Sequence, residues 1–258
     1  MTVLSIILIF LLYRSYLFYK KRTDFKMLAE SQKIYLNDFF PKHFTYFTYL
    51  NEEEKQEFII RALHIREQLK INASSDLLVS ENVKTLISAA YTQITFGFDN
   101  YYLGNFNRIF LHPGIFYSRF IDRDVKGLTF GNGIIHWSWD DFVKGYMYSD
   151  DKINLALHEL AHALQLESFE NQEVETPYYD AWVTYAEIEL AEMKAHPEKA
   201  YFRAYASTNI HEFFAVAVEY FFEDPINFRE QRGILYQATS KVLMQDMAER
   251  ISPILNSS

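Results

Sequence analysis

The sequence contains no cysteine among its 258 residues and few residues that interrupt regular structure, with 8 glycines and 6 prolines. Without cysteine, the chain has no disulfide framework, no thiolate metal site, no iron–sulfur cluster and no cysteine nucleophile. The few glycines and prolines leave little room for long flexible linkers. Basic residues are outnumbered, and the formal net charge of −9 argues against nucleic acid as a partner, because binding phosphates requires clustered cations.

Apolar and aromatic residues are plentiful. They make up 49% and 17% of the chain, which is typical of a protein that folds around a hydrophobic core. The length suits one large domain, or one domain with a small helical appendage. We divide the chain into residues 1–22 and a folded domain over residues 23–258.

Residues 1–22 differ in composition from the rest of the chain. Residues 3–13 are apolar apart from one serine, and residues 16–19 continue the run. The segment contains Arg14, Lys20, Lys21 and Arg22 and no acidic residue, whereas all 34 acidic residues lie beyond it. A separate role for this segment is therefore expected.

Three interpretations of this segment are possible. A cleaved signal peptide would need positive charge before the apolar run and a small-residue cleavage site, and both are missing. A buried helix of a soluble domain is the second interpretation. We favour an uncleaved membrane anchor, with membrane contact through residues 3–19, although such a helix is only about 25 Å long. The bases at residues 20–22 would place the domain in the cytoplasm, and without an anchor the protein would also be cytoplasmic.

The hydrophobic periodicity predicts an α+β domain. Helical spacing covers residues 52–70 and 80–94, and again about 150–168, 178–195, 209–223 and 232–251. Between the two sets, residues 106–112 and 134–139 are short runs of branched and aromatic residues, which is typical of strands. Strands in the middle of the chain, with helices before and after, favour α+β over alternating α/β.

The chemistry is indicated by an H-E-x-x-H pattern, formed by His158, Glu159 and His162. Two histidines four residues apart project from one face of a helix, so both imidazoles can reach one metal ion. Glu159 lies beside that face, where it can polarise a metal-bound water. Asp150 or Asp151 is expected to cap this helix. The pattern predicts a zinc site.

A catalytic zinc usually has a third protein ligand. The downstream candidates are Glu187, Glu189, Glu192, Glu212, Glu219, His196 and His211. Glu212 is favoured because it begins an almost wholly apolar helix, where a carboxylate needs a partner. Glu219 lies two turns further on and either accepts a hydrogen bond from a ligand histidine or pairs with a base.

Three stretches resemble the Mlc titration factor A family of zinc-dependent peptidases. Residues 154–164 match its Asn-x-x-x-His-Glu-x-Ala-His-x-Leu pattern, residues 205–222 match the region around its glutamate ligand, and residues 133–139 are similar to a strand upstream of the metal helix. The resemblance implies a zincin-like fold, similar to the catalytic domain of anthrax lethal factor, with a small mixed sheet and a helical N-terminal part. It also implies that His158, His162 and Glu212 bind one catalytic Zn²⁺.

The same resemblance implies that Glu159 is the general base and that Tyr205 stabilises the oxyanion during hydrolysis of a peptide or protein substrate. We expect the strand at residues 134–139 to offer a backbone edge to an extended peptide. The sequence leaves aminopeptidase-like and endopeptidase cleavage open, and a zinc hydrolase acting on a non-peptide amide is a further alternative.

A membrane-tethered regulatory binding protein with a vestigial zinc site is the main alternative. The resemblance implies a regulatory protein partner, since cytosolic family members act in glucose-uptake regulation by binding a transcriptional repressor. The presence of Glu159 argues against a vestigial site, because a structural metal site does not need a general base. The chain departs from the family at Gln165, where an aspartate is common, and at residues 1–22, which have no counterpart in the cytosolic members.

Overall fold

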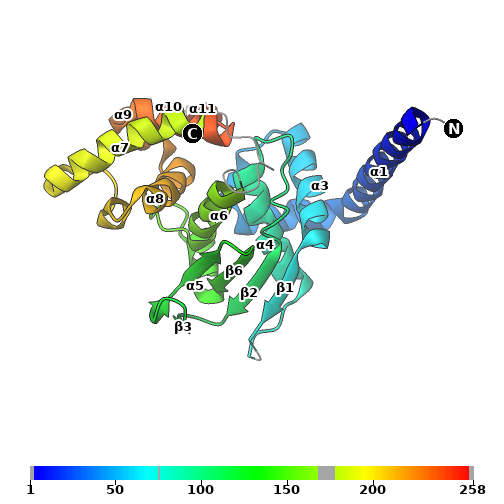
Figure 1. Cartoon of the computed structure of the whole chain (residues 1–258), viewed down its shortest axis with the longest axis horizontal. Helices are drawn as coiled ribbons and strands as arrows, with labels where there is room; N and C mark the ends of the chain where they lie inside the picture. Colours follow the sequence, from blue (N-terminus) through cyan, green and yellow to red (C-terminus); the bar gives the residue numbers. More distant parts are fainter. Residues whose placement is uncertain (1–2, 75, 168–177, 256–258) are drawn as a thin grey trace.

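The computed structural model describes residues 3–74, 76–167 and 178–255 (Figure 1). Its sheet has four strands in the order β1-β2-β6-β5, formed by β1 (Lys70–Ala73), β2 (Arg108–His112), β6 (Ile134–Ser138) and β5 (Gly127–Phe130). The first three strands run parallel, and β5 pairs with β6 in the antiparallel direction. The sheet is therefore mixed, and β5 forms one of its edges.

Alternation along the strands decides which face of the sheet is covered. Ile109 and Leu111 of β2 and Ile135 and Trp137 of β6 are completely or almost completely buried, and they share one face. Their neighbours in the sequence point to the other, more exposed face, as expected for a strand with period-two patterning. The buried face lies toward helices α4 (Glu81–Thr95) and α6 (Leu155–Leu166), which pack against each other.

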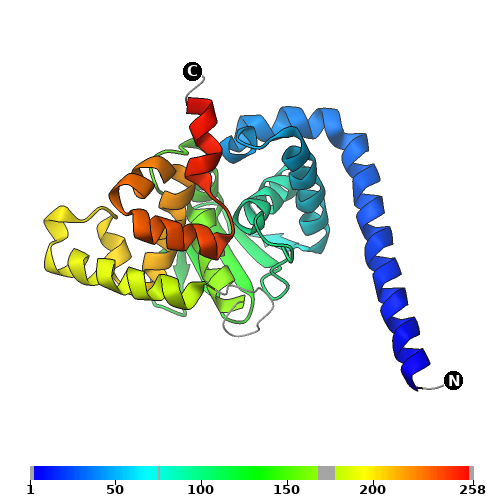
Figure 2. The same ribbon diagram turned by 90° about the horizontal axis from the view of Figure 1, so that it is seen from above.

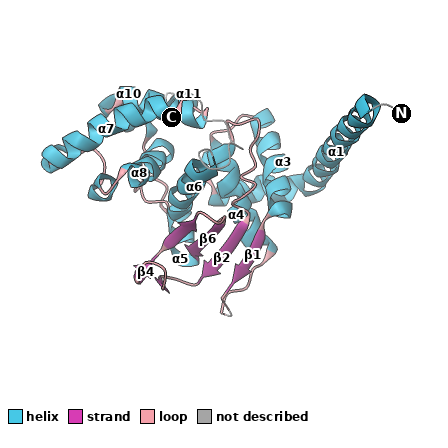
Figure 3. Cartoon of the chain, in the orientation of Figure 1, coloured by secondary structure: helices cyan, strands magenta, loops and turns pink. Residues whose placement is uncertain are grey.

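Helices account for most of the remaining chain, and Figure 3 shows that most of them lie on one side of the four-stranded sheet, above it in this view. A two-stranded hairpin, β3 (Phe116–Ser118) with β4 (Arg123–Val125), immediately precedes β5. The other helices are α1 (Val3–His43), α2 (Thr45–Thr48), α3 (Glu52–Gln68), α5 (Trp139–Met147), α7 (Tyr179–Ala195), α8 (Ile210–Glu223), α9 (Pro225–Gln231), α10 (Gly233–Leu243) and α11 (Met247–Leu255), with short 3-10 turns at Pro197–Lys199 and Ala204–Ser207.

Local signals explain where several helices begin. Asn51 caps α3 in a reciprocal arrangement, because its side chain accepts from the Glu54 backbone while the Glu54 carboxylate accepts from the Asn51 backbone. Ser80 is likewise the N-cap residue of α4. The core that these helices enclose is rich in rings, and its largest fully buried side chains include Trp137 and Trp182.

The N-terminal helix α1 projects from the body of the protein as a long rod, shown in dark blue (Figure 2). Among the side chains of α1 that the structure describes, those packed against the core lie from Leu28 onward, and Leu36 and Phe40 are fully buried. The membrane anchor predicted for residues 1–22 falls mostly within α1. Across the described ranges, no helix has both the length and the apolar character needed to cross a bilayer.

The α+β class predicted from the sequence is confirmed, but several elements differ. The strand at residues 134–139 was expected to offer an edge, and this is wrong: β6 lies between β2 and β5 and is paired on both sides. The metal helix begins at Leu155 rather than near residue 150, with Asn154 as its cap in place of the aspartates. The last predicted helix, 232–251, divides into α10 and α11 because Met244 adopts a left-handed conformation.

Gly97 allows the end of α4 to approach the end of α10. A β-carbon at this position would lie about 2.6 Å from the carbonyl carbon of Met244 and would also overlap the carbonyl oxygen of Leu243. We expect Gly97→Ala to lower the free energy of unfolding by about 1–3 kcal/mol, because backbone atoms must move to admit the methyl group. Urea denaturation monitored by circular dichroism measures the change.

Gly233→Ala is the matched control, since a β-carbon at Gly233 meets no atom within 4 Å. Its stability should be unchanged, or higher by up to about 1 kcal/mol, because alanine restricts the unfolded chain. Equal midpoints and slopes for the two variants would contradict the close contact at Gly97.

Candidate metal centre

Helix α6 is held at its first turn by Asn154. The Asn154 side chain accepts a hydrogen bond from the Leu157 backbone (3.1 Å) and donates to the Gly145 carbonyl (3.0 Å) and the Glu223 carboxylate (3.1 Å). Leu157, Leu160, Ala161 and Leu164 then form a buried face against the core. This packing leaves the side chains of His158, Glu159 and His162 directed into a cleft.

Helix α8 brings a carboxylate to the same cleft. Asn209 caps it by accepting from the backbone N–H groups of His211 (2.9 Å) and Glu212 (3.0 Å), so Glu212 lies in the first turn. Residues 213–222 are all buried. Because α8 packs directly against α6, Glu212 faces the two histidines.

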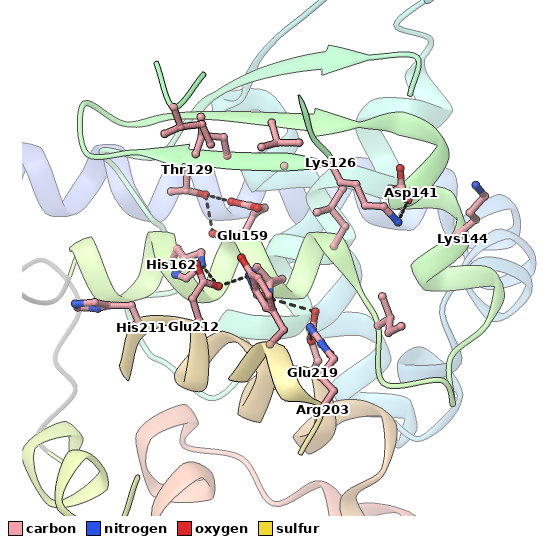
Figure 4. Close-up of a pocket in the computed structure, with 18 of the residues that line it drawn as sticks. Lys126, Thr129, Asp141, Lys144, Glu159, His162, Arg203, His211, Glu212 and Glu219 are labelled. Carbon is pink, nitrogen blue, oxygen red and sulfur yellow. Dashed lines mark hydrogen bonds and ion pairs between the residues drawn. The ribbon is translucent and has the colours of Figure 1, made fainter. Parts of the chain in front are cut away.

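Three side chains converge closely enough to bind one metal ion (Figure 4). His158 Nε2 lies 3.0 Å from Glu212 Oε2, and His162 Nε2 lies 3.5 Å from the same oxygen. One potential ligand atom from each of the three residues lies within 4.8 Å of the others. Two imidazole nitrogens and one carboxylate oxygen form a donor set that suits a divalent metal with an open coordination position.

The charges of the three groups are strongly coupled. Burial opposes ionisation of Glu212, but hydrogen bonds from His158 and His162 hold the pKa of its carboxyl well below the usual range. For His158, burial alone would lower the pKa of the imidazole. The neighbouring carboxylates of Glu212 and Glu219 have the larger, opposite effect, so the pKa is raised to about 10. A positive charge is therefore favoured at this point, and a bound cation can replace the proton.

The other ring nitrogen of His158 faces Glu219, also on α8. His158 Nδ1 lies 3.3 Å from Glu219 Oε1, and Glu219 is 1% exposed. The guanidinium of Arg203 contacts the second carboxylate oxygen of Glu219 and also donates to the carbonyl of Lys152, just before α6. Arg203 therefore balances a buried carboxylate that in turn orients the imidazole. Glu219 thus lies next to both groups considered for it, the His158 ring and a base, Arg203.

Glu159 is oriented by the edge strand β5. The hydroxyl of Thr129 lies 2.7 Å from Glu159 Oε2 and 3.0 Å from the Glu159 carbonyl oxygen. Gly127, on the same strand, leaves room for this carboxylate, because a β-carbon there would overlap Glu159 Oε1 and lie 2.7 Å from Leu155 Cδ1. The Glu159 carboxylate thus reaches from α6 to β5 and contacts the strand at a residue that has no side chain.

Tyr205 lies in the 3-10 turn Ala204–Ser207, which packs against α8. Its ring centroid is 5.8 Å from that of His158, and 46% of the residue is exposed. Burial and the neighbouring Glu212 carboxylate raise the pKa of Tyr205 to about 12. The phenol therefore keeps its proton at neutral pH and can act as a hydrogen-bond donor.

These residues line a cleft of about 900 Å³. Its walls come from β4 and β5 on one side and from α6, α8 and the Arg203–Tyr205 segment on the other. The residues noted above share it with apolar side chains from both walls, including Val125, Leu128 and Leu155. The cleft therefore offers both polar groups and apolar surface to a ligand.

The structure separates the other candidate ligands from this cluster. Glu189 pairs with Arg232 at 2.6 Å, and His196 is exposed and contacts Glu198. Glu187 and Glu192 are exposed on α7, and His211 points away from Glu212 (Figure 4). Gln165 donates a hydrogen bond to the Tyr179 hydroxyl (2.7 Å).

Sequence reasoning missed three residues of the site, namely Thr129, Gly127 and Arg203. Threonine, glycine and arginine are common residue types that mark no site by themselves. Each of these three residues affects the site by contacting a glutamate distant in the sequence. A signal for Arg203 did exist, because a buried Glu219 required a cation and Arg203 is a nearby base in the chain. No comparable pattern identifies Gly127 or Thr129 before β5 is placed beside α6.

The α+β fold and the convergent His, His and Glu side chains are those of a metallopeptidase-like domain and are compatible with the zincin type. The chain belongs to the glucose-regulated metallo-peptidase M90 family, whose model matches residues 18–243. It is also similar to two proteins named Mlc titration factor A. The one from Serratia proteamaculans is 24% identical over 220 residues, covering 78% of this chain and 84% of that protein. The one from Yersinia enterocolitica is 22% identical over 222 residues, covering 78% and 82%.

Replacing Glu219 tests its influence on the metal centre. We expect Glu219→Gln to weaken metal binding by about 10–100-fold, because the amide orients and polarises His158 less effectively than a carboxylate. Competition with a chromophoric chelator measures the affinity. Glu187→Gln, the same substitution on an exposed face of α7, should bind metal as the unmodified protein does. Equal affinities in the two variants would show that Glu219 does not act on the metal centre.

Proposed function

We propose that the protein is a zinc-dependent peptidase that cleaves peptide bonds at this centre. The observation that carries the proposal is the convergence of His158, His162 and Glu212, together with a separate carboxylate, Glu159, on the same cleft. A purely structural metal site is closed by protein ligands and requires no adjacent base. Family membership supports metallopeptidase chemistry, and the donor set favours zinc.

The chemical roles follow from the positions of the residues. His158, His162 and Glu212 would hold the zinc ion, which when bound would supply a Lewis acid to activate a water molecule and polarise the peptide carbonyl. Glu159, held by Thr129, accepts a proton from the attacking water and returns it to the amine that leaves. The protonated phenol of Tyr205 donates a hydrogen bond to the carbonyl oxygen as its negative charge grows.

The edge strand β5 provides a surface for the peptide backbone. In the described parts of the chain, β5 pairs only with β6, so its other side can pair with an extended peptide in the cleft. Such pairing holds a substrate through its main chain without requiring a particular sequence. Strand β5 thus takes the role that the sequence analysis assigned to residues 134–139.

A regulatory binding protein with a vestigial metal site is the second candidate. It is motivated by the name of the two similar proteins, which describes titration of Mlc rather than hydrolysis. The room made for Glu159 by Gly127 favours catalysis, because binding alone does not need an oriented base. The following experiment separates turnover from binding.

Purified protein loaded with zinc should cleave a mixture of unstructured peptides, and Glu159→Gln should reduce turnover by about 10²–10⁴-fold while retaining zinc. Glu212→Gln should lose both zinc and activity, because it removes a charged ligand. Mass spectrometry of the products and metal analysis measure the two effects. Amino-terminally acetylated peptides distinguish the modes, since aminopeptidase-like cleavage requires a free amine. Equal turnover by unmodified protein and Glu159→Gln would refute the mechanism.

The fit between Gly127 and Glu159 provides an independent test. We expect Gly127→Ala to lower kcat about a hundredfold or more with zinc content unchanged, because the methyl group displaces the Glu159 carboxylate. Gly114→Ala, in the turn before β3, is the matched control, since a β-carbon there approaches only Asp140 Oδ2, at 3.7 Å. Full activity of Gly127→Ala would mean that the position of Glu159 does not limit hydrolysis.

A further inference from the structure

The projecting part of α1 exposes apolar side chains on every side. The six consecutive residues Ile7 to Leu12 are each 52–62% exposed. Successive residues on an α-helix are rotated by about 100°, so six of them occupy the whole circumference. Beyond them, Tyr13, Tyr16, Leu17 and Tyr19 are also exposed. A continuous apolar surface of this kind is unfavourable in water and indicates a binding partner.

The distribution of apolar residues decides which partner fits. A second copy of the chain would cover one stripe of the helix and leave the others in water, whereas lipid acyl chains can surround a helix. Arg14 and the bases at residues 20–22 follow the apolar turns, and the first acid in the sequence is Asp24. Such a cluster attracts anionic headgroups, and tyrosines favour the interface between headgroups and acyl chains.

We propose that the projecting end of α1 inserts into one leaflet of an anionic lipid bilayer, with Arg14 and the tyrosines at the level of the headgroups. The apolar turns at residues 3–12 extend for about 15 Å, roughly half of a hydrocarbon core. This depth agrees with the finding that no helix in the described ranges is suited to crossing a membrane. The inference does not rest on the peptidase activity.

Insertion of α1 determines how far the body of the protein lies from the membrane. Between residue 22 and Leu28, which packs against the core, the helix rises about 9 Å. This length acts as a spacer between the headgroups and the body of the protein (Figure 2).

Flotation of the full-length protein with vesicles tests the proposal. The bound fraction should be at least roughly tenfold higher with phosphatidylcholine–phosphatidylglycerol vesicles than with phosphatidylcholine alone, because a segment with four bases and no acid favours anionic headgroups. The combined variant Leu8→Ser, Leu11→Ser and Leu12→Ser should lose binding to both. As a matched control, Ile34→Ser, Leu78→Ser and Ile115→Ser replace three equally or more exposed apolar residues outside the projecting end and should bind normally.

Two further measurements address depth and the competing partner. Phe10→Trp should show fluorescence that brominated lipids quench, whereas Ile34→Trp should show none, with the three native tryptophans subtracted using the unmodified protein. Failure of the unmodified protein to float with anionic vesicles overturns the proposal, and so does equal flotation of the Leu8, Leu11 and Leu12 variant. Concentration-dependent oligomers without vesicle binding would overturn it in favour of a second copy.

Discussion

Helices α6 and α8 bury nearly all of the residues that face each other, and this packing brings two imidazoles and a carboxylate from separate parts of the chain to one point. The caps fix the helices along their axes. Asn154 ties the start of α6 to Gly145 and Glu223, and Asn209 sets the first turn of α8, where Glu212 lies. A shift of either helix by one residue would rotate a ligand out of the cluster, since each residue turns by about 100°.

The same packing gathers several carboxylates in a partly buried space, which requires compensation. Arg203 balances Glu219, and Thr129 and Asn154 supply hydrogen bonds to Glu159 and Glu223. Burial raises the pKa of Glu223 to about 8, so this group remains mostly neutral at pH 7 and adds little negative charge. The remaining negative charge surrounds His158, where a proton or a divalent cation is stabilised. The preference for a cation at His158 therefore arises from the charged groups of α6 and α8 together and not from one residue.

Features encoded within one helical turn could be predicted from the sequence, and features that depend on distant contacts could not. The spacing of His158 and His162 and the apolar context of Glu212 were sufficient to identify three side chains that the structure brings together. Strand β5 was missed because its four residues, Gly-Leu-Thr-Phe, contain neither enough alternation nor a turn signal to mark a strand. Asn154 was passed over as the cap because two aspartates precede it. Its selection depends on contacts with Gly145 and Glu223, which the local sequence does not show.

Strand β5 connects the chemistry to the fold through two of its residues. Thr129 and Gly127 are two positions apart, so both face α6, and together they hold Glu159 and leave space for it. The backbone of the same strand forms the edge available to a peptide. A substrate that pairs with this edge is therefore positioned relative to the strand that also positions Glu159. Because one rigid element controls both, the distance between a bound backbone and the Glu159 carboxylate is set by strand geometry rather than by a mobile loop.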